Sequence, residues 1–146
     1  MSEEAEAYEK FLKGLRLRYF SPQEVIRYAS AVRNGEQNSL PPEELWDNLV
    51  PCLNLMDTLR HYIKRPIRLT SIYRSPDFNR KGVGGSRRSF HMQNCAIDFQ
   101  VDGMTPNAAF NQLLKMRKAG AFIGGLGQYP TFTHVDTRDK IATWER

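Results

Sequence analysis

The stretch CAIDFQV, residues 95–101, alternates its side chains with a period of two. Its odd-numbered positions are all apolar and share one face of a strand, while Asp98 lies on the opposite face. A second stretch, FTHVD at residues 132–136, places His134 and Asp136 on one face of another strand. If these strands are neighbours, the two carboxylates and His134 converge, and His91 joins them because it closely precedes the first strand.

Helical patterns come in a block before the strands. Ser21, Pro22 and Glu24 form a capping-box start for a helix that should run to about residue 32. Pro51 lies inside the next helical pattern and should kink or split it. The other expected elements are a loop at 34–41, a strand at 67–72, an irregular segment at 74–90, a helix from Thr105 to about 119, and strands at 121–129 and 132–137. This order predicts an α+β fold with a helical N-terminal part and a small, mostly antiparallel sheet.

The chain has 146 residues, which fits one domain. We expect a lead-in at 1–18 and the domain proper at 19–146. The start of the chain carries no apolar signal segment, and no run is long enough to span a membrane. We therefore expect a protein that is cytoplasmic as synthesised and reaches a cell wall only through phage lysis or another secretion system. We also expect a monomer.

The net charge of +5 and the pI near 9.4 favour a polyanionic partner or a solvated basic face. The basic clusters lack the interleaved aromatic residues of a single-strand binding platform, so no nucleic acid partner is expected. Cys52 and Cys95 are too few for a disulfide framework and are expected to be reduced thiols in the core.

Two histidines and one carboxylate make a three-ligand set for zinc. Such a set leaves the fourth position open to water, which is typical of catalytic sites and not of structural ones. His91, Asp98 and His134 are the candidates, whereas His61 lies in a basic helix end and is expected at the surface. From spacing alone, a reading of His91 and His134 as ordinary polar residues stays open.

Several motifs that follow one another in order along the chain favour the metal site over this ordinary reading. They are SIYRSPDFN at 71–79, VGG at 83–85, SFH at 89–91, AIDF at 96–99, GGLGQYP at 124–130, HVDTR at 134–138, and Trp144. Together they resemble the zinc D-alanyl-D-alanine carboxypeptidase-like family of murein peptidases, whose fold is similar to the hedgehog signalling domain. The resemblance covers roughly residues 19–146 and implies a zinc hydrolase acting on peptidoglycan stem peptides or cross-links that contain D-amino acids.

The resemblance also assigns roles to single residues. It implies one zinc ion per chain, held by His91, Asp98 and His134. Arg74 matches the arginine that holds a substrate carbonyl or carboxylate. Ser89 matches the residue two positions before the first ligand, a structural hydrogen bonder. Beyond the resemblance, Tyr129 is a further candidate as a polarising donor, and both residues belong to the expected substrate-binding set.

Two positions depart from the family pattern. Asn94 stands where many relatives have glycine, and asparagine tolerates the left-handed backbone of such a turn. Thr131 stands where several relatives carry the general base, and threonine cannot act as that base. Asp136 is the nearest acidic residue and becomes the candidate for the role. Asp136 could accept the proton from the attacking water or could orient a ligand imidazole. Two other functions stay open: a non-catalytic zinc-bearing module that binds wall peptide or a protein, and a nucleic-acid-binding domain with structural zinc.

Overall fold

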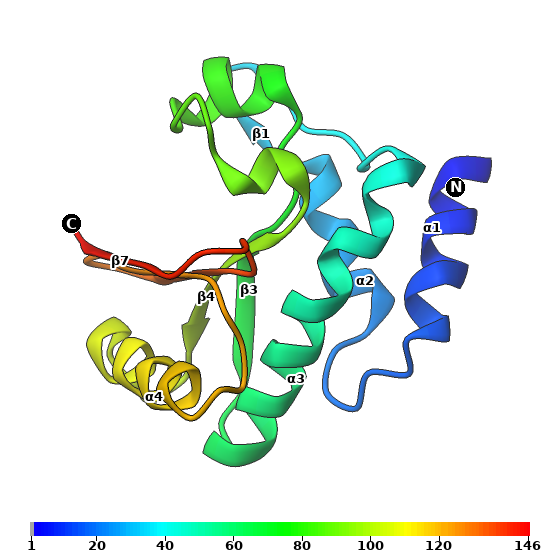
Figure 1. Cartoon of the computed structure of the whole chain (residues 1–146). Helices are drawn as coiled ribbons and strands as arrows, with labels where there is room; N and C mark the ends of the chain where they lie inside the picture. Colours follow the sequence, from blue (N-terminus) through cyan, green and yellow to red (C-terminus); the bar gives the residue numbers. More distant parts are fainter. Residues whose placement is uncertain (1) are drawn as a thin grey trace.

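The computed structural model describes residues 2–146, so Met1 of the expected lead-in lies outside the described residues. The α+β fold expected from the sequence is confirmed (Figure 1). In chain order the elements are α1 (Glu3–Gly14), α2 (Pro22–Ile26), η1 (Arg27–Ser30), β1 (Val32–Arg33), β2 (Glu36–Gln37), η2 (Glu43–Leu49), α3 (Val50–Ile63), β3 (Ile67–Ser71), η3 (Phe78–Val83), η4 (Phe90–Gln93), β4 (Ala96–Val101), α4 (Pro106–Lys118), β5 (Gly125–Gln128), β6 (Thr133–Asp136) and β7 (Ala142–Glu145).

The main sheet has five strands in the order β3-β4-β6-β5-β7. All neighbouring pairs are antiparallel except β5 and β7, which run parallel. The two strands that carry the acids and His134 are therefore neighbours, as the sequence predicts. Asp98 and His134 are direct partners in the register of β4 and β6.

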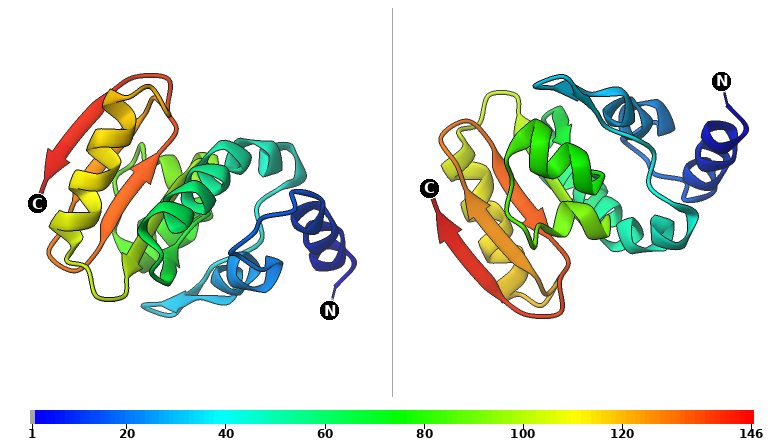
Figure 2. Two further views of the ribbon diagram at one scale, coloured as in Figure 1. Left: turned by 90° about the horizontal axis from the view of Figure 1, so that it is seen from below. Right: turned by 90° about the horizontal axis from the view of Figure 1, so that it is seen from above.

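The two faces of this sheet have different coverings. Helices α3 and α4 lie on one face, where Ile97, Phe99 and Val135 join the apolar residues of both helices in one core. The segment 74–93 lies on the other side of the sheet, as the two views in Figure 2 show. Because side chains alternate along a strand, Asp98 and His134 face this second covering.

The helix signals of the sequence are confirmed at several ends. Ser21 and Glu24 form the expected capping box of α2. Thr105 caps α4, whose chain turns away at Gly120 with a positive φ of 87°. Pro51 falls in the first turn of α3, where its missing N–H costs nothing, so the long helical pattern is split into η2 and α3.

Other local expectations were wrong. The helix after Ser21 ends at Ile26 and continues only as the 3₁₀ turn η1. The expected loop at 34–41 contains part of the hairpin β1–β2, because Asn34 and Gly35 both adopt the positive φ that tight hairpin turns require. The irregular segment at 74–90 contains the π-helical turn η3. The C-terminal strand β7 was not anticipated.

Helix α1 packs on the same core as the rest of the chain. Tyr8 and Leu12 are buried, and the Tyr8 ring contacts Trp46 of η2 with ring centroids 5.1 Å apart. The separation of residues 1–18 from the domain stays a prediction. None of the helices between residues 2 and 146 has the length and apolarity needed to cross a bilayer.

Candidate metal centre

Three different elements supply the candidate ligands. Asp98 comes from β4, His134 from β6, and His91 from the 3₁₀ turn η4 that leads into β4. Ser89 begins this turn, and its Oγ accepts a hydrogen bond of 3.2 Å from the backbone N–H of His91. Asn94 ends the turn in the left-handed region at φ 58°, so the asparagine adopts the backbone conformation expected at this position.

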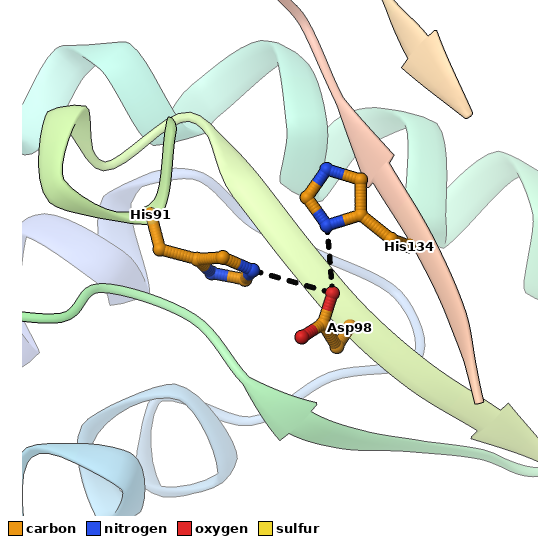
Figure 3. Close-up of side chains that lie close together, drawn as sticks. All are labelled: His91, Asp98 and His134. Carbon is orange, nitrogen blue, oxygen red and sulfur yellow. Dashed lines mark hydrogen bonds and ion pairs between the residues drawn. The ribbon is translucent and has the colours of Figure 1, made fainter. Parts of the chain in front are cut away.

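The three side chains converge on one point (Figure 3). Asp98 Oδ1 lies 2.8 Å from His134 Nδ1 and 3.2 Å from His91 Nε2, and one ligand atom from each residue lies within 4.8 Å of the others. Ligand atoms at about 2.0 Å from a tetrahedral zinc ion would be roughly 3.3 Å apart. The spacing of these three groups therefore fits a metal ion.

Hydrogen bonds fix which ring nitrogens face the site. His91 Nδ1 lies 2.6 Å from the carbonyl oxygen of Ile72 and must donate to it. His134 Nε2 lies 2.8 Å from Asp136 Oδ2 and donates in the same way. These contacts leave His91 Nε2 and His134 Nδ1 as the candidate ligand nitrogens. Among residues 2–146, His91 Nε2 is one of the few buried polar side-chain atoms without a hydrogen-bond partner, which a bound cation would supply.

The electrostatics of the site also favour a cation. Burial lowers the pKa of His91 and keeps its imidazole neutral, the form that binds metals. Burial acts to raise the pKa of Asp98, but the neighbouring imidazoles outweigh it and hold this pKa well below its usual range. Burial likewise acts to lower the pKa of His134, yet its contacts with Asp136 and Asp98 raise it. A positive charge is thus favoured between Asp98 and His134, either a proton or a metal ion.

Asp136 lies behind the site. It is fully buried, and its carboxylate accepts hydrogen bonds from Gly125 N at 2.9 Å and from Arg138 Nε and Nη2 at 2.8 and 2.7 Å. Burial acts to raise its pKa, but the contacts with Arg138 and His134 lower it instead. Arg138 in turn lies over the ring of Phe90, 4.1 Å from its centroid. Asp136 is therefore an ionised and rigidly held acceptor for His134.

A cleft of about 570 Å³ opens in front of the ligands. Arg74 lies at its wall, and its guanidinium donates to Ser71 Oγ, Asn79 Oδ1 and Asp98 Oδ2 over distances of 3.1 to 3.3 Å. The remaining lining residues are Val83, Ser86, Arg88, Ser89, Phe90, His91, Asp98, Tyr129, Phe132, His134, Arg138, Trp144 and Arg146. A larger hollow of about 830 Å³ lies at the outer edge of β3, but no cysteine or histidine lines it.

Aromatic side chains form one wall of the cleft. Tyr129 and Phe132 stack with ring centroids 4.4 Å apart. The Trp144 indole N–H donates to Tyr129 Oη at 3.0 Å, so the Tyr129 hydroxyl proton is free to donate elsewhere. Trp144 also lies against His134, with ring centroids 5.2 Å apart. Gly127 makes this packing possible, because a Cβ there would lie 2.5 Å from the indole.

The structure thus gathers most of the expected site residues. His91, Asp98 and His134 meet at one point, and Arg74, Ser89 and Tyr129 line the same cleft. Asp136 does not line the cleft, and Thr131 is exposed on the turn before β6. Sequence reasoning missed Arg138, although a cation two residues after a candidate catalytic acid was a readable signal.

The comparisons with known proteins agree with this geometry. The family model described as Peptidase M15 matches residues 18–136, well over half of the chain. The chain belongs to the peptidase M15 family. This membership confirms the resemblance read from the sequence motifs. The M15 match ends at Asp136, so Arg138, Trp144 and Arg146 lie beyond it.

Individual relatives in this comparison are peptidoglycan endopeptidases by name. The chain is 32% identical over 99 residues to the peptidoglycan L,D-endopeptidase MepK of Escherichia coli K12. The aligned stretch covers 64% of this M15 chain and 49% of the relative. It is 35% identical over 81 residues to the probable peptidoglycan L,D-endopeptidase MepK of Haemophilus influenzae, covering 50% of this chain and 39% of the relative. The chain therefore spans about half the length, or less, of these relatives.

Proposed function

We propose that this protein is a zinc-dependent peptidase that hydrolyses D-amino-acid-containing stem peptides or cross-links of peptidoglycan. The observation that carries the proposal is a three-ligand site, His91, Asp98 and His134, which opens into a cleft with Arg74 at its wall. Three protein ligands leave a position for water, as catalytic zinc sites do. The names of the MepK relatives supply the substrate class.

Zinc, when bound, supplies a Lewis acid and activates water for attack at neutral pH. The residues of the chain hold the substrate around it. Arg74 is only 12% exposed, is held by three acceptors and presents a rigid cation to the cleft. We assign to it the binding of a substrate carbonyl or carboxylate. We assign to Tyr129 the donation of its hydroxyl proton to a developing oxyanion. In support, the Trp144 indole N–H donates to the Tyr129 hydroxyl oxygen and leaves the hydroxyl proton free.

We assign Asp136 a positioning role. Its carboxylate reaches His134 only at Nε2, the nitrogen turned away from the candidate ligand atoms. A carboxylate in that position fixes the tautomer and ring orientation of a ligand histidine and raises its basicity. Of the two roles that the sequence left open for Asp136, orientation of a ligand is therefore the one that its contacts support.

One observation favours the non-catalytic alternative. Among the described residues that line the cleft, Asp98 is the one carboxylate, and it belongs to the ligand set. A wall-peptide-binding module of the same fold would need no separate proton acceptor. Digestion of purified murein, followed by analysis of the released muropeptides, separates the two functions. Cleavage that a chelator abolishes and zinc restores supports the peptidase, whereas binding of murein without any cleavage by the zinc-loaded protein supports the module.

A further inference from the structure

Two arginines at the cleft have guanidinium groups that pair with no acidic side chain among residues 2–146. Arg88 and Arg146 both line the cleft and are both exposed. Neither takes part in any of the ion pairs found between residues 2 and 146. The other two arginines of the lining are engaged, since Arg74 pairs with Asp98 and Arg138 pairs with Asp136.

Acidic side chains near these arginines face elsewhere. Glu145 precedes Arg146, but β7 alternates its side chains, so Trp144 and Arg146 share the face of the cleft and Glu145 takes the other. Asp139 is exposed and does not line the cleft. The cleft is therefore positively charged beyond the metal ligands.

The backbone at each arginine is held in place. The N–H of Arg88 donates to Ser86 Oγ at 3.3 Å, and Arg88 lies three residues before the ligand His91. The N–H of Arg146 donates to the carbonyl of Gln128 at 2.8 Å, which extends the pairing of β7 with β5 next to Tyr129. The two guanidinium groups therefore come from two separate segments that are each tied to the site.

We propose that Arg88 and Arg146 bind free carboxylate groups of the substrate, so that the cleft selects acidic peptides over their amidated forms. This inference rests on the peptidase proposed above and names the chemistry that its substrate must carry. A guanidinium group matches a carboxylate with two parallel hydrogen bonds, and a carboxamide offers it neither the charge nor the second acceptor. Stem peptides that keep their side-chain and α-carboxylates free have this chemistry, and those in which the same groups are amidated do not.

The test compares two synthetic stem peptides that differ only in free or amidated carboxyl groups. For the free acid, Arg88→Ala or Arg146→Ala should raise KM by about 10-fold, the scale of a lost charge-assisted hydrogen bond, and leave kcat within about twofold. The amidated peptide should show no change. Arg87→Ala is the matched control, because Arg87 is an exposed neighbour that does not line the cleft. High salt should shrink the difference between the two peptides, since exposed charges are screened.

Binding gives a second readout that does not depend on turnover. Calorimetry with the zinc-loaded protein and the free-acid peptide should show the same loss of affinity in Arg88→Ala and Arg146→Ala and none in Arg87→Ala. Equal affinity of wild type for the acid and the amide, or unchanged affinity in both variants, would overturn the inference and leave the peptidase intact. Failure of the wild type to cleave any murein peptide while it still prefers the acid would instead overturn the peptidase and support the carboxylate site.

Discussion

The Asp136 carboxylate contacts His134 at Nε2, 2.8 Å away, on the opposite side of the imidazole from Asp98. The two carboxylates therefore hold one ring from both sides. Asp98 contacts Nδ1, the candidate ligand nitrogen, and Asp136 accepts the hydrogen bond of Nε2, which therefore carries the proton. Arg138 and the backbone of Gly125 complete the shell around Asp136.

This arrangement predicts the effect of Asp136→Asn. The amide keeps the shape but loses the charge that orients His134, so zinc affinity should fall by about 10- to 100-fold. Competition with a chromophoric chelator measures this affinity, and Asp139→Asn, an exposed acid nearby, is the control. A variant that binds zinc as tightly as wild type but turns over roughly 10²-fold more slowly would identify Asp136 as the general base instead.

Removal of a ligand should remove the metal. We expect one zinc ion per chain in the wild type and loss of that ion in His91→Ala and His134→Ala, because two protein ligands hold zinc poorly. Elemental analysis after dialysis measures the stoichiometry. His61→Ala should keep its zinc, since His61 lies apart from the site and contacts Tyr19. Stoichiometric zinc in the double variant His91→Ala/His134→Ala would refute the site.

Arg74→Lys should separate metal binding from substrate binding. Lysine keeps the positive charge but loses the planar group that contacts Ser71, Asn79 and Asp98 together. The variant should therefore retain zinc and lose most of its activity on murein peptides. Arg80→Lys, at an exposed position outside the cleft, serves as the control. Activity close to wild type in Arg74→Lys would show that Arg74 does not act on the substrate.

Gly127→Ala should disturb the site through the aromatic wall. The added Cβ would lie 2.5 Å from the Trp144 indole, which must move away from Tyr129 and His134. We expect a stability loss of about 1–3 kcal/mol, the usual scale of overpacking, together with lower activity. Gly14→Ala is the matched control, because a Cβ there meets no atom within 4 Å. If Gly127→Ala unfolds at the same urea concentration as the wild type and keeps wild-type activity, the packing role of Gly127 is wrong.

Helix α1 should contribute to the stability of the whole domain. Tyr8 is 1% exposed and packs on Trp46, so Tyr8→Ala should lower the free energy of unfolding by about 3 kcal/mol or more. Tyr62 is 67% exposed, and Tyr62→Ala should change the free energy of unfolding by less than about 0.5 kcal/mol. Chemical unfolding followed by circular dichroism measures both. Equal stability of the two variants would mean that residues 1–18 are a separate lead-in.

The sequence by itself determined the class of fold, and the order of its motifs, through the family resemblance, named the candidate ligands. Period-two alternation at 95–101 and 132–136 assigns each side chain to a face, since consecutive residues of a strand point in opposite directions. The capping box at Ser21 is equally local, because its hydrogen bonds join residues three positions apart. Such features depend on neighbours in the chain and can be read without the fold.

Only the tertiary structure decided the role supported for Asp136 and the distribution of charge in the cleft. His134 and Asp136 share a strand face, but pairing of β4 with β6 places Asp98 at one ring nitrogen of His134 and leaves the other to Asp136. That Arg88 and Arg146 line the cleft without an ion pair in the described part of the chain likewise depends on contacts between segments far apart in sequence. Distances between such segments follow from packing of the whole chain, and no local pattern of residue types contains them.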